Sequence, residues 1–185
     1  MNDELCEAFG IPPRLRLNSR EADSFNNESE KLYRWFAPNT EYLSDGRLSE
    51  STIGQVFSPP SNISCNRSNF CYYPTDVLYN ASEHLHRNNY GVIQTFIKNV
   101  KNHTFEFLQT TQNNETVKIE IKLDIEHKPE ECMYPHSEIT IYRNGEKLTN
   151  QVKPPRLKTL LRRKLIELFT VCHEPNSNFQ FEELS

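Results

Sequence analysis

TVKIEIKLDIE, residues 116–126, is the clearest strand in the sequence. Its aliphatic side chains alternate with polar or charged ones, and they are Val117, Ile119, Ile121, Leu123 and Ile125. A period of two predicts a strand with one buried face and one wet face, which is typical of antiparallel sheets. Asn113-Asn114 supplies turn residues just before it.

Three neighbouring segments also have strand character. Residues 91–98, GVIQTFIK, are rich in β-branched and aromatic side chains, and residues 103–109, HTFEFLQ, alternate. Residues 137–143, SEITIYR, precede Asn144-Gly145, a strong hairpin signal, and residues 146–148 could form a short return strand. Together these segments predict an antiparallel β-meander.

Three helices are expected around this meander. Residues 28–36 begin with acidic side chains, and Pro74 with Thr75 or Asp76 resembles a helix entry for residues 74–87. Residues 155–171 carry leucines at helical spacing. The fold class expected is therefore α+β, with a C-terminal amphipathic helix packed on the meander and an irregular helix/loop N-terminal half.

Residues 48–80 have no clean helical or strand period. This stretch combines Cys65, Cys71 and the isolated Arg67 with aromatic residues and a Pro-Pro pair. We expect an ordered, irregular joint between the N-terminal part and the meander, with Arg67 as its pin. It is also the best candidate for a functional surface.

The length of 185 residues suits one domain. We expect residues 1–27 to form a flexible or surface-lying arm, residues 28–173 a single α+β domain, and residues 174–185 an acidic tail. An apolar fraction of 36% is enough for a core, and a net charge of -4 argues against a nucleic-acid coating protein. A local basic face remains compatible with that charge.

The five cysteines are odd in number, are widely spaced and include no C-x-x-C pair, which argues against a zinc ribbon or a thioredoxin motif. Cys65 and Cys71 are interpreted as buried thiols. No basic leader or apolar run of ~18 residues is visible. A soluble, reducing, cytoplasmic setting without membrane contact is therefore expected. Six N-x-S/T sequons, at Asn27, Asn62, Asn66, Asn80, Asn102 and Asn114, are taken as coincidental.

Common nucleotide-binding and hydrolase motifs are missing from the sequence. G-x-x-x-x-G-K-[ST], G-x-G-x-x-G and G-x-S-x-G do not occur, and five glycines make phosphate-cradling loops improbable. We therefore predict no cofactor and no metal site.

The expected C-terminal helix carries a concentrated positive charge. Five basic side chains lie within nine residues, and they are Arg156, Lys158, Arg162, Arg163 and Lys164. Three interpretations stay open: a solvated helix face, a docking face for an acidic protein partner or for the chain's own acidic tail, and a contact for the phosphate backbone of a nucleic acid.

An enzymatic interpretation depends on Arg67, His136 and Glu138. His136 stands where a strand begins, and Glu138 lies two residues on, so it could orient the imidazole. With Arg67 binding a phosphate or carboxylate, such a set would suit a small RNase or an ADP-ribosyl-transfer toxin. The structural alternative is a capping His136 and a buried Arg67.

Short motifs in the same region form a pattern. They are Arg47-Leu48-Ser49-x-Ser51, Phe57, Ile63-Ser64-x-x-Arg67, Pro74-Thr75-Asp76-x-Leu78 and Tyr134-Pro135-His136-Ser137-Glu138-Ile139. The pattern resembles a group of small uncharacterised prokaryotic proteins with R-x-S-S-x-x-F, L-S-V-x-R, P-E-x-x-L and N-x-x-H-x-x-I, although Tyr134 departs from their Asn. The resemblance implies a bacterial origin and groups Ser49, Ser51, Arg67 and His136, without an established activity.

These observations favour an intracellular protein-binding or adaptor module of a bacterial assembly, in a defence or toxin-related system. The alternative is the small Arg/His-dependent enzyme. The two hypotheses differ in one respect that a structure can test: the enzyme needs Arg67 and His136 in one open cleft.

Overall fold

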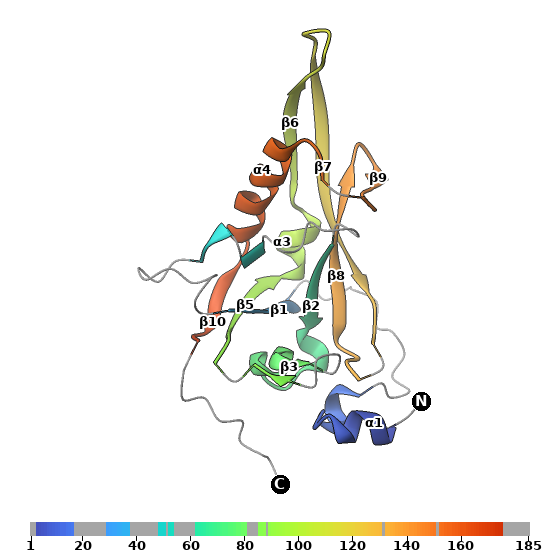
Figure 1. Cartoon of the computed structure of the whole chain (residues 1–185), viewed down its shortest axis with the longest axis vertical. Coiled ribbons are helices and arrows are strands. Elements are labelled where there is room, and N and C mark those ends of the chain that lie inside the picture. The colour runs from blue at the N-terminus through green and yellow to red at the C-terminus, as the bar shows by residue number, and fades with distance from the viewer. Residues whose placement is uncertain are drawn as a thin grey trace.

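A computed structural model describes residues 3–16, 29–37, 48–50, 52–53, 62–80, 85–87, 89–130, 132–150 and 152–175. The fold mixes α and β structure. Mostly antiparallel strands form a curled half-barrel sheet, and few helices accompany it in the described ranges (Figure 1).

One large sheet contains most of the strands. They are β1 (Lys31–Phe36), β2 (Asn62–Arg67), β5 (Gly91–Phe96), β6 (Thr104–Thr110), β7 (Thr116–His127), β8 (His136–Arg143), β9 (Glu146–Lys147) and β10 (Thr170–His173). Their order is β10-β5-β1-β2-β8-β7-β6, with β9 paired to β8. A separate small pair joins β3 (Tyr79–Asn80) to β4 (Leu85–His86).

In the described part of the chain, the helical elements are short apart from one. They are α1 (Asp3–Ala8), η1 (Pro13–Leu15), η3 (Ser68–Phe70), η4 (Pro74–Leu78), α3 (Ile97–Lys101) and α4 (Pro155–Ile166). The apolar face of α4 joins the main core through Leu157, Leu161 and Leu165, which are fully buried. Among the described residues, no helix combines the length and apolar content that crossing a membrane requires.

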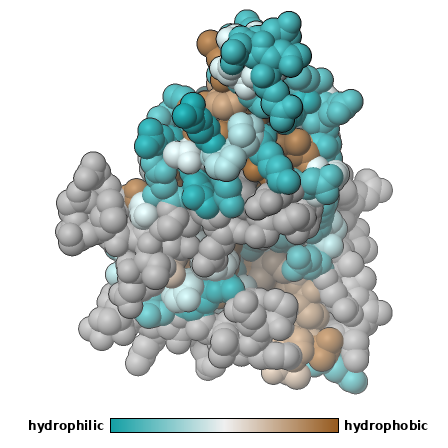
Figure 2. Space-filling view, turned by 45° about the horizontal axis from the view of Figure 1, so that its top comes forward, coloured by the Kyte–Doolittle hydropathy of each residue, from teal (hydrophilic) through white to brown (hydrophobic). Residues whose placement is uncertain are grey.

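The strand predicted at residues 116–126 is confirmed as β7. Ile119, Ile121 and Leu123 are buried in the main core, as the alternation indicated. Val117 is instead 43% exposed, because the β6–β7 hairpin projects beyond the rest of the sheet (Figure 1). The upper part of the molecule is mostly hydrophilic, with isolated hydrophobic side chains (Figure 2).

The helix predicted at residues 28–36 is wrong, because the segment forms β1. Its side chains alternate in burial, with Leu32, Arg34 and Phe36 inside. β1 pairs with β5 on one side and β2 on the other, so both of its edges are hydrogen-bonded. Aromatic residues favour strands, and this tertiary pairing outweighs the helix-like spacing.

Residues 51 and 54–61 of the predicted irregular stretch 48–80 lie outside the described residues, and its described part is less irregular than predicted, because it contains the central strand β2. Cys65, Asn66 and Arg67 are buried one after another. A strand covered on both faces does not alternate between apolar and polar residues. The polar identity of Asn66 and Arg67 further conceals it in the sequence.

The helix predicted at residues 74–87 is also wrong. The Asp76 carboxylate accepts hydrogen bonds from the backbone N–H groups of Tyr72 and Tyr73, at 2.9 and 3.3 Å. This capping supports only the short η4, after which the chain enters β3. Asp76 also receives a hydrogen bond from Arg14 Nη2 at 2.6 Å, so it joins the N-terminal segment to this turn.

The last predicted helix, residues 155–171, is too long. α4 ends at Ile166, and Thr170–His173 forms β10 on the outer edge of β5. Phe169 is buried in the main core between the two elements. The β-branched Thr170 and Val171 favour the extended conformation there.

The described part of the N-terminal arm is attached to the sheet by a disulfide. Cys6 in α1 is bonded to Cys132, which precedes β8 and lies 126 residues away in the sequence. Ile11 and Leu15 are buried around this bond. Cys65 is a buried free thiol, as predicted, whereas Cys71 is a free thiol that is only half-buried. Residues 1–2 and 17–27 of the arm and residues 176–185 of the acidic tail lie outside the described residues.

Candidate functional site

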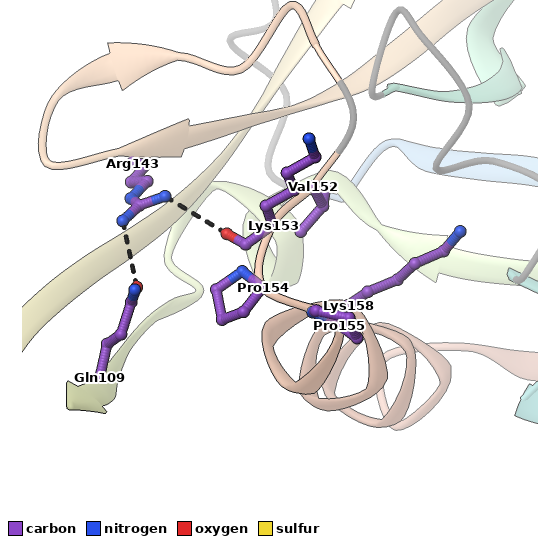
Figure 3. Close-up of a pocket in the computed structure, with 7 residues that line it drawn as sticks. All are labelled: Gln109, Arg143, Val152, Lys153, Pro154, Pro155 and Lys158. Carbon is purple, nitrogen blue, oxygen red and sulfur yellow. Dashed lines mark hydrogen bonds between the residues drawn. The ribbon is translucent and has the colours of Figure 1, made fainter. Parts of the chain in front are cut away.

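A cavity of about 460 Å³ lies beside the start of α4. The residues that line it are Gln109, Arg143, Val152, Lys153, Pro154, Pro155 and Lys158 (Figure 3). They come from the end of β6, the end of β8, the segment before α4 and the first turn of α4. Three of these residues are basic and none is acidic, so the cavity has a positive potential.

Arg143 is held in place on both sides of its guanidinium. Nη2 donates to Gln109 Oε1 and Nη1 donates to the Lys153 carbonyl oxygen, both at 3.3 Å (Figure 3). These contacts connect β6, β8 and the segment that enters α4. The guanidinium is therefore positioned at the wall of the cavity before any ligand is present.

The cavity also has an apolar wall. Val152 is buried in the main core, and Pro154 and Pro155 stand at the entrance to α4. Prolines lack a backbone N–H group, so this wall offers carbonyls and hydrocarbon rather than donors. The start of a helix adds positive potential from its aligned peptide dipoles.

The five predicted basic residues are divided between the cavity and the remaining surface of α4. Lys158 lines the cavity, and Arg156, two residues earlier in α4, is exposed. Arg163 Nε donates to Glu50 Oε1 at 2.8 Å, and Lys164 Nζ donates to Glu167 Oε2 at 3.0 Å. Arg162 is half-buried. The face is therefore partly neutralised by acids of the same chain.

Arg67 is enclosed within the fold. Its Nε and Nη2 donate to the two carboxylate oxygens of Glu30, at 2.8 and 2.7 Å, and both side chains are 0% exposed. The guanidinium also lies 4.8 Å from the centre of the Phe70 ring. The described residues leave no approach by which a substrate would reach it, so the geometry favours the structural interpretation of Arg67.

His136 lies on the neighbouring strand but on the opposite face. It pairs in register with Asn66, the residue before Arg67, and successive side chains of a strand point to opposite faces. His136 and Arg67 therefore do not share an open cleft. This arrangement does not provide the joint Arg67–His136 site that the enzyme hypothesis requires.

His136 instead contacts Ser64, which lies on the same face of β2. Ser64 Oγ is 2.8 Å from His136 Nε2, and His136 Nδ1 is 2.7 Å from the Lys128 carbonyl oxygen. A carbonyl only accepts hydrogen bonds, so Nδ1 carries a proton, and in the neutral imidazole Nε2 accepts the hydrogen bond of the Ser64 hydroxyl. Glu130 Oε1 lies 3.5 Å from Nδ1.

Glu138 does not orient His136 as the spacing suggested. Its carboxylate pairs with the Lys128 ammonium group, which raises the pKa of Lys128. The sequence did not indicate Ser64 as the partner of His136, because the two residues are joined only by the pairing of β2 with β8. Ser49 is a half-buried loop residue whose carbonyl accepts the Thr52 N–H at 3.0 Å, and Ser51 lies outside the described residues.

A metal site is not indicated in the ranges that the structure describes, since no group of three or more His, Cys, Asp or Glu residues is arranged to hold an ion there. No family model, curated protein or solved structure matches the chain. The resemblance to small prokaryotic proteins therefore stays a prediction.

Proposed function

We propose that the chain is a protein-binding module, and that the cavity at the start of α4 takes an acidic segment of a partner protein. The observation that carries this proposal is that Arg143, Lys153 and Lys158 line one cavity, with no acidic residue among its described lining residues. Carboxylates suit this arrangement because they accept hydrogen bonds from guanidinium and ammonium groups at close range.

The mixed lining favours a peptide over a nucleic acid. Val152, Pro154 and Pro155 give an apolar surface on which a hydrophobic side chain next to the carboxylates can pack. None of the seven described lining residues is aromatic, whereas single-stranded nucleic acids are bound by stacking bases on aromatic side chains. The lining therefore supports binding of an acidic peptide better than binding of a nucleic acid through the basic helix.

Peptide binding with charge-matched variants tests this function. A fluorescent peptide of alternating Glu and Leu is titrated with wild type, Lys158→Glu, Arg143→Glu and the control Lys98→Glu, which reverses one exposed charge on α3. We expect the two cavity variants to weaken binding at least tenfold and the control to stay within about twofold. Equal losses in all three would show that only net charge matters, and that outcome rejects the cavity.

The same titration with single-stranded RNA separates the two ligand classes. Tighter binding of RNA than of peptide, with a steep loss of affinity as salt rises, would replace the peptide proposal by the nucleic-acid one. A co-purification of the partner from native cells, repeated with Arg162→Glu and Arg163→Glu, tests whether the outer surface of α4 contributes.

The setting of this module remains a prediction. The cavity can bind an acidic segment in any setting. Its function does not depend on the bacterial assembly, the link to defence or toxin systems or the cytoplasmic location expected from the sequence. The disulfide between Cys6 and Cys132 favours an oxidising compartment instead.

A second candidate function is acyl transfer at Ser64. The observation that favours it is the hydrogen bond from Ser64 Oγ to His136 Nε2 at 2.8 Å, with Nδ1 directed at a carbonyl oxygen. In this arrangement the imidazole can take the hydroxyl proton as Oγ attacks. An alkyl fluorophosphonate tests it: Oγ bonds to phosphorus, fluoride leaves, and the proton passes to His136. Labelling of wild type but not of Ser64→Ala supports it, and equal labelling of both rejects it.

A further inference from the structure

Two of the six N-x-S/T sequons lie at exposed turns. Asn102 follows the last residue of α3, and Asn114 lies in the turn between β6 and β7 with a φ of 59°. Both asparagine side chains are exposed. The hydroxyl residues of these sequons, Thr104 and Thr116, are exposed as well.

Two other sequons lie inside the sheet. Asn66 is 4% exposed, and its Nδ2 donates to Met133 Sδ at 3.2 Å. Asn62 is half-buried on the central strand β2, and the hydroxyl of its sequon, Ser64, is bonded to His136. A folded molecule has no room for a glycan on an amide enclosed like that of Asn66. Among these four described sequons, the asparagines of two are therefore exposed, Asn62 is half-buried and Asn66 is enclosed.

The disulfide is a second, independent observation that points to the same modification. Cys6 and Cys132 are joined across 126 residues of sequence. Disulfides persist in the oxidising compartments through which secreted and cell-surface proteins pass, and they are rare in reducing ones. Asn-x-Ser/Thr is the acceptor sequence for N-linked glycans on surface loops of proteins that pass through those compartments.

We propose that Asn102 and Asn114 carry N-linked glycans, added in the oxidising compartment where the Cys6–Cys132 disulfide forms. The donor is an oligosaccharide linked to a lipid diphosphate. The bond between the first sugar carbon and the diphosphate oxygen breaks, and a bond from that carbon to the asparagine Nδ2 forms. The amide releases one proton, and the lipid diphosphate leaves.

The two sites lie at the two ends of β6. This strand is the last in the sheet order, so one of its edges has no partner strand among the described residues. Exposed edges can pair with a second chain, and β6 also carries Leu108, which is 66% exposed. Figure 1 shows this strand in the projecting hairpin. Glycans at Asn102 and Asn114 would cover both ends of this edge.

Protein purified from the organism that encodes it tests the proposal directly. Peptide N-glycosidase in H₂¹⁸O converts a glycosylated asparagine to ¹⁸O-labelled aspartate, which peptide mass spectrometry locates. We expect label at Asn102 and Asn114 and unlabelled Asn66. Unlabelled asparagine at Asn102 or Asn114 overturns the proposal for that site. Label at Asn66 overturns the selection of sites by exposure.

Variants at the hydroxyl position separate glycosylation from changes in the turn. Thr116→Ala removes the sequon but keeps Asn114, whose positive φ another residue would adopt less readily. Thr116→Ser is the matched control, because it retains the acceptor sequence. In the same cells, Thr116→Ala should lose one glycan step in gel mobility and Thr116→Ser should keep it. Identical mobility of the two variants overturns the assignment of Asn114.

Sedimentation of the native glycoprotein tests the covering of β6. After enzymatic removal of the glycans, we expect self-association that rises with protein concentration, while the glycosylated protein stays monomeric under the same conditions. An unchanged sedimentation coefficient after removal overturns the role of the glycans at this edge.

Discussion

Arg67 and Glu30 form a two-point ion pair that solvent does not reach. Two guanidinium nitrogens of Arg67 donate to the two carboxylate oxygens of Glu30, at 2.8 and 2.7 Å. Glu30 stands directly before β1 and Arg67 ends β2, and Leu32 pairs in register with Arg67. The pair therefore joins the beginning of one central strand to the end of the next.

Removal of one partner of this pair is expected to destabilise the fold strongly. Arg67→Met leaves a buried carboxylate and Glu30→Leu leaves a buried guanidinium, and each should lower the free energy of unfolding by about 3–5 kcal/mol. The double variant should lose less than the sum of the two, because no charge remains unpaired. Urea unfolding of the four proteins measures this difference.

The exposed pair of Arg163 with Glu50 is the control for this cycle. Its side chains are 63% and 43% exposed, so Arg163→Ala should change the free energy of unfolding by less than about 1 kcal/mol. Two results would contradict the role of the buried pair. In one, the double Arg67/Glu30 variant loses as much unfolding free energy as the two single variants together. In the other, each single variant loses as little as the Arg163→Ala control.

His127 makes stability depend on pH in a defined window. Burial, with the positive charge of Arg67 as the next cause, lowers the pKa of His127 to about 4, whereas an unfolded histidine titrates near ~6.5. As the pH falls below about 6.5, the unfolded chain binds a proton that the folded chain rejects. Stability is therefore lost between about pH 6.5 and pH 4. The backbone contact with His136 opposes the shift, and the charge of His136 adds to it.

His127→Phe isolates this contribution. Phenylalanine can keep the ring contacts that His127 makes with Phe70 and Tyr134, whose centres lie 5.6 and 5.2 Å away. Between pH 7 and pH 4.5, wild type should lose about 1–2 kcal/mol more than the variant, after allowance for solvent screening of a partly exposed ring. Parallel loss in the two proteins, measured by urea unfolding at each pH, would rule out His127 as the titrating group.

The sequence predicted β7 from its period of two and β5 and β8 from their β-branched and aromatic residues, but it missed the central strands β1 and β2. β7 alternates over its whole core-facing part, so periodicity identified it. In β1 the inward positions include Arg34, and in β2 three successive residues are buried. Their strand character comes from pairing with neighbours distant in sequence, which local patterns do not contain.

The candidate cavity was predicted only in part for the same reason. Lys158 was indicated by the basic helix, but Gln109 and Arg143 come from two strands that approach α4 only in the folded chain. A sequence signal for the cavity was available, because the Lys153-Pro154-Pro155 helix entry follows Arg143 by only ten residues. Only tertiary structure shows that these cations line one cavity.

Two glycines are expected to respond to alanine for different reasons. Gly145 has a φ of +83° and follows Asn144 at +49°, and nothing lies within 4 Å of an added Cβ. Gly145→Ala should therefore cost about 1 kcal/mol through the backbone alone. Gly145→Asn should cost less, because Asn tolerates this region better. Equal loss in the two variants, in urea unfolding, would contradict a backbone origin.

At Gly91 the obstacle is steric. An added Cβ would overlap the ring of Phe36 and approach the His173 carbonyl oxygen to 3.0 Å. Gly91→Ala should cost about 1–3 kcal/mol through overpacking. Phe36→Leu in the same chain should recover part of that loss by giving space, and the absence of any recovery would exclude the Phe36 contact as its cause.

Thiol labelling is expected to separate the two disulfide-bonded cysteines from the three free thiols, and to rank free thiols by their burial. Burial raises the pKa of Cys65 to about 12 and that of Cys172 to about 11, and it raises the pKa of Cys71 as well. Thiolates are the reactive form, so iodoacetamide at neutral pH should label the folded protein slowly. Cys172, which is only half-buried, should react before the fully enclosed Cys65.

Unfolding and reduction then resolve the remaining cysteines. In denaturant without reductant, three thiols should react, namely Cys65, Cys71 and Cys172, because Cys6 and Cys132 are joined. Addition of a reductant should raise the number to five. Five labelled cysteines before reduction, in protein trapped by acid directly from native cells, would show that the disulfide does not form there. That result would indicate that the chain resides in a reducing compartment. The proposal of glycans at Asn102 and Asn114 would then rest on the exposed sequons alone.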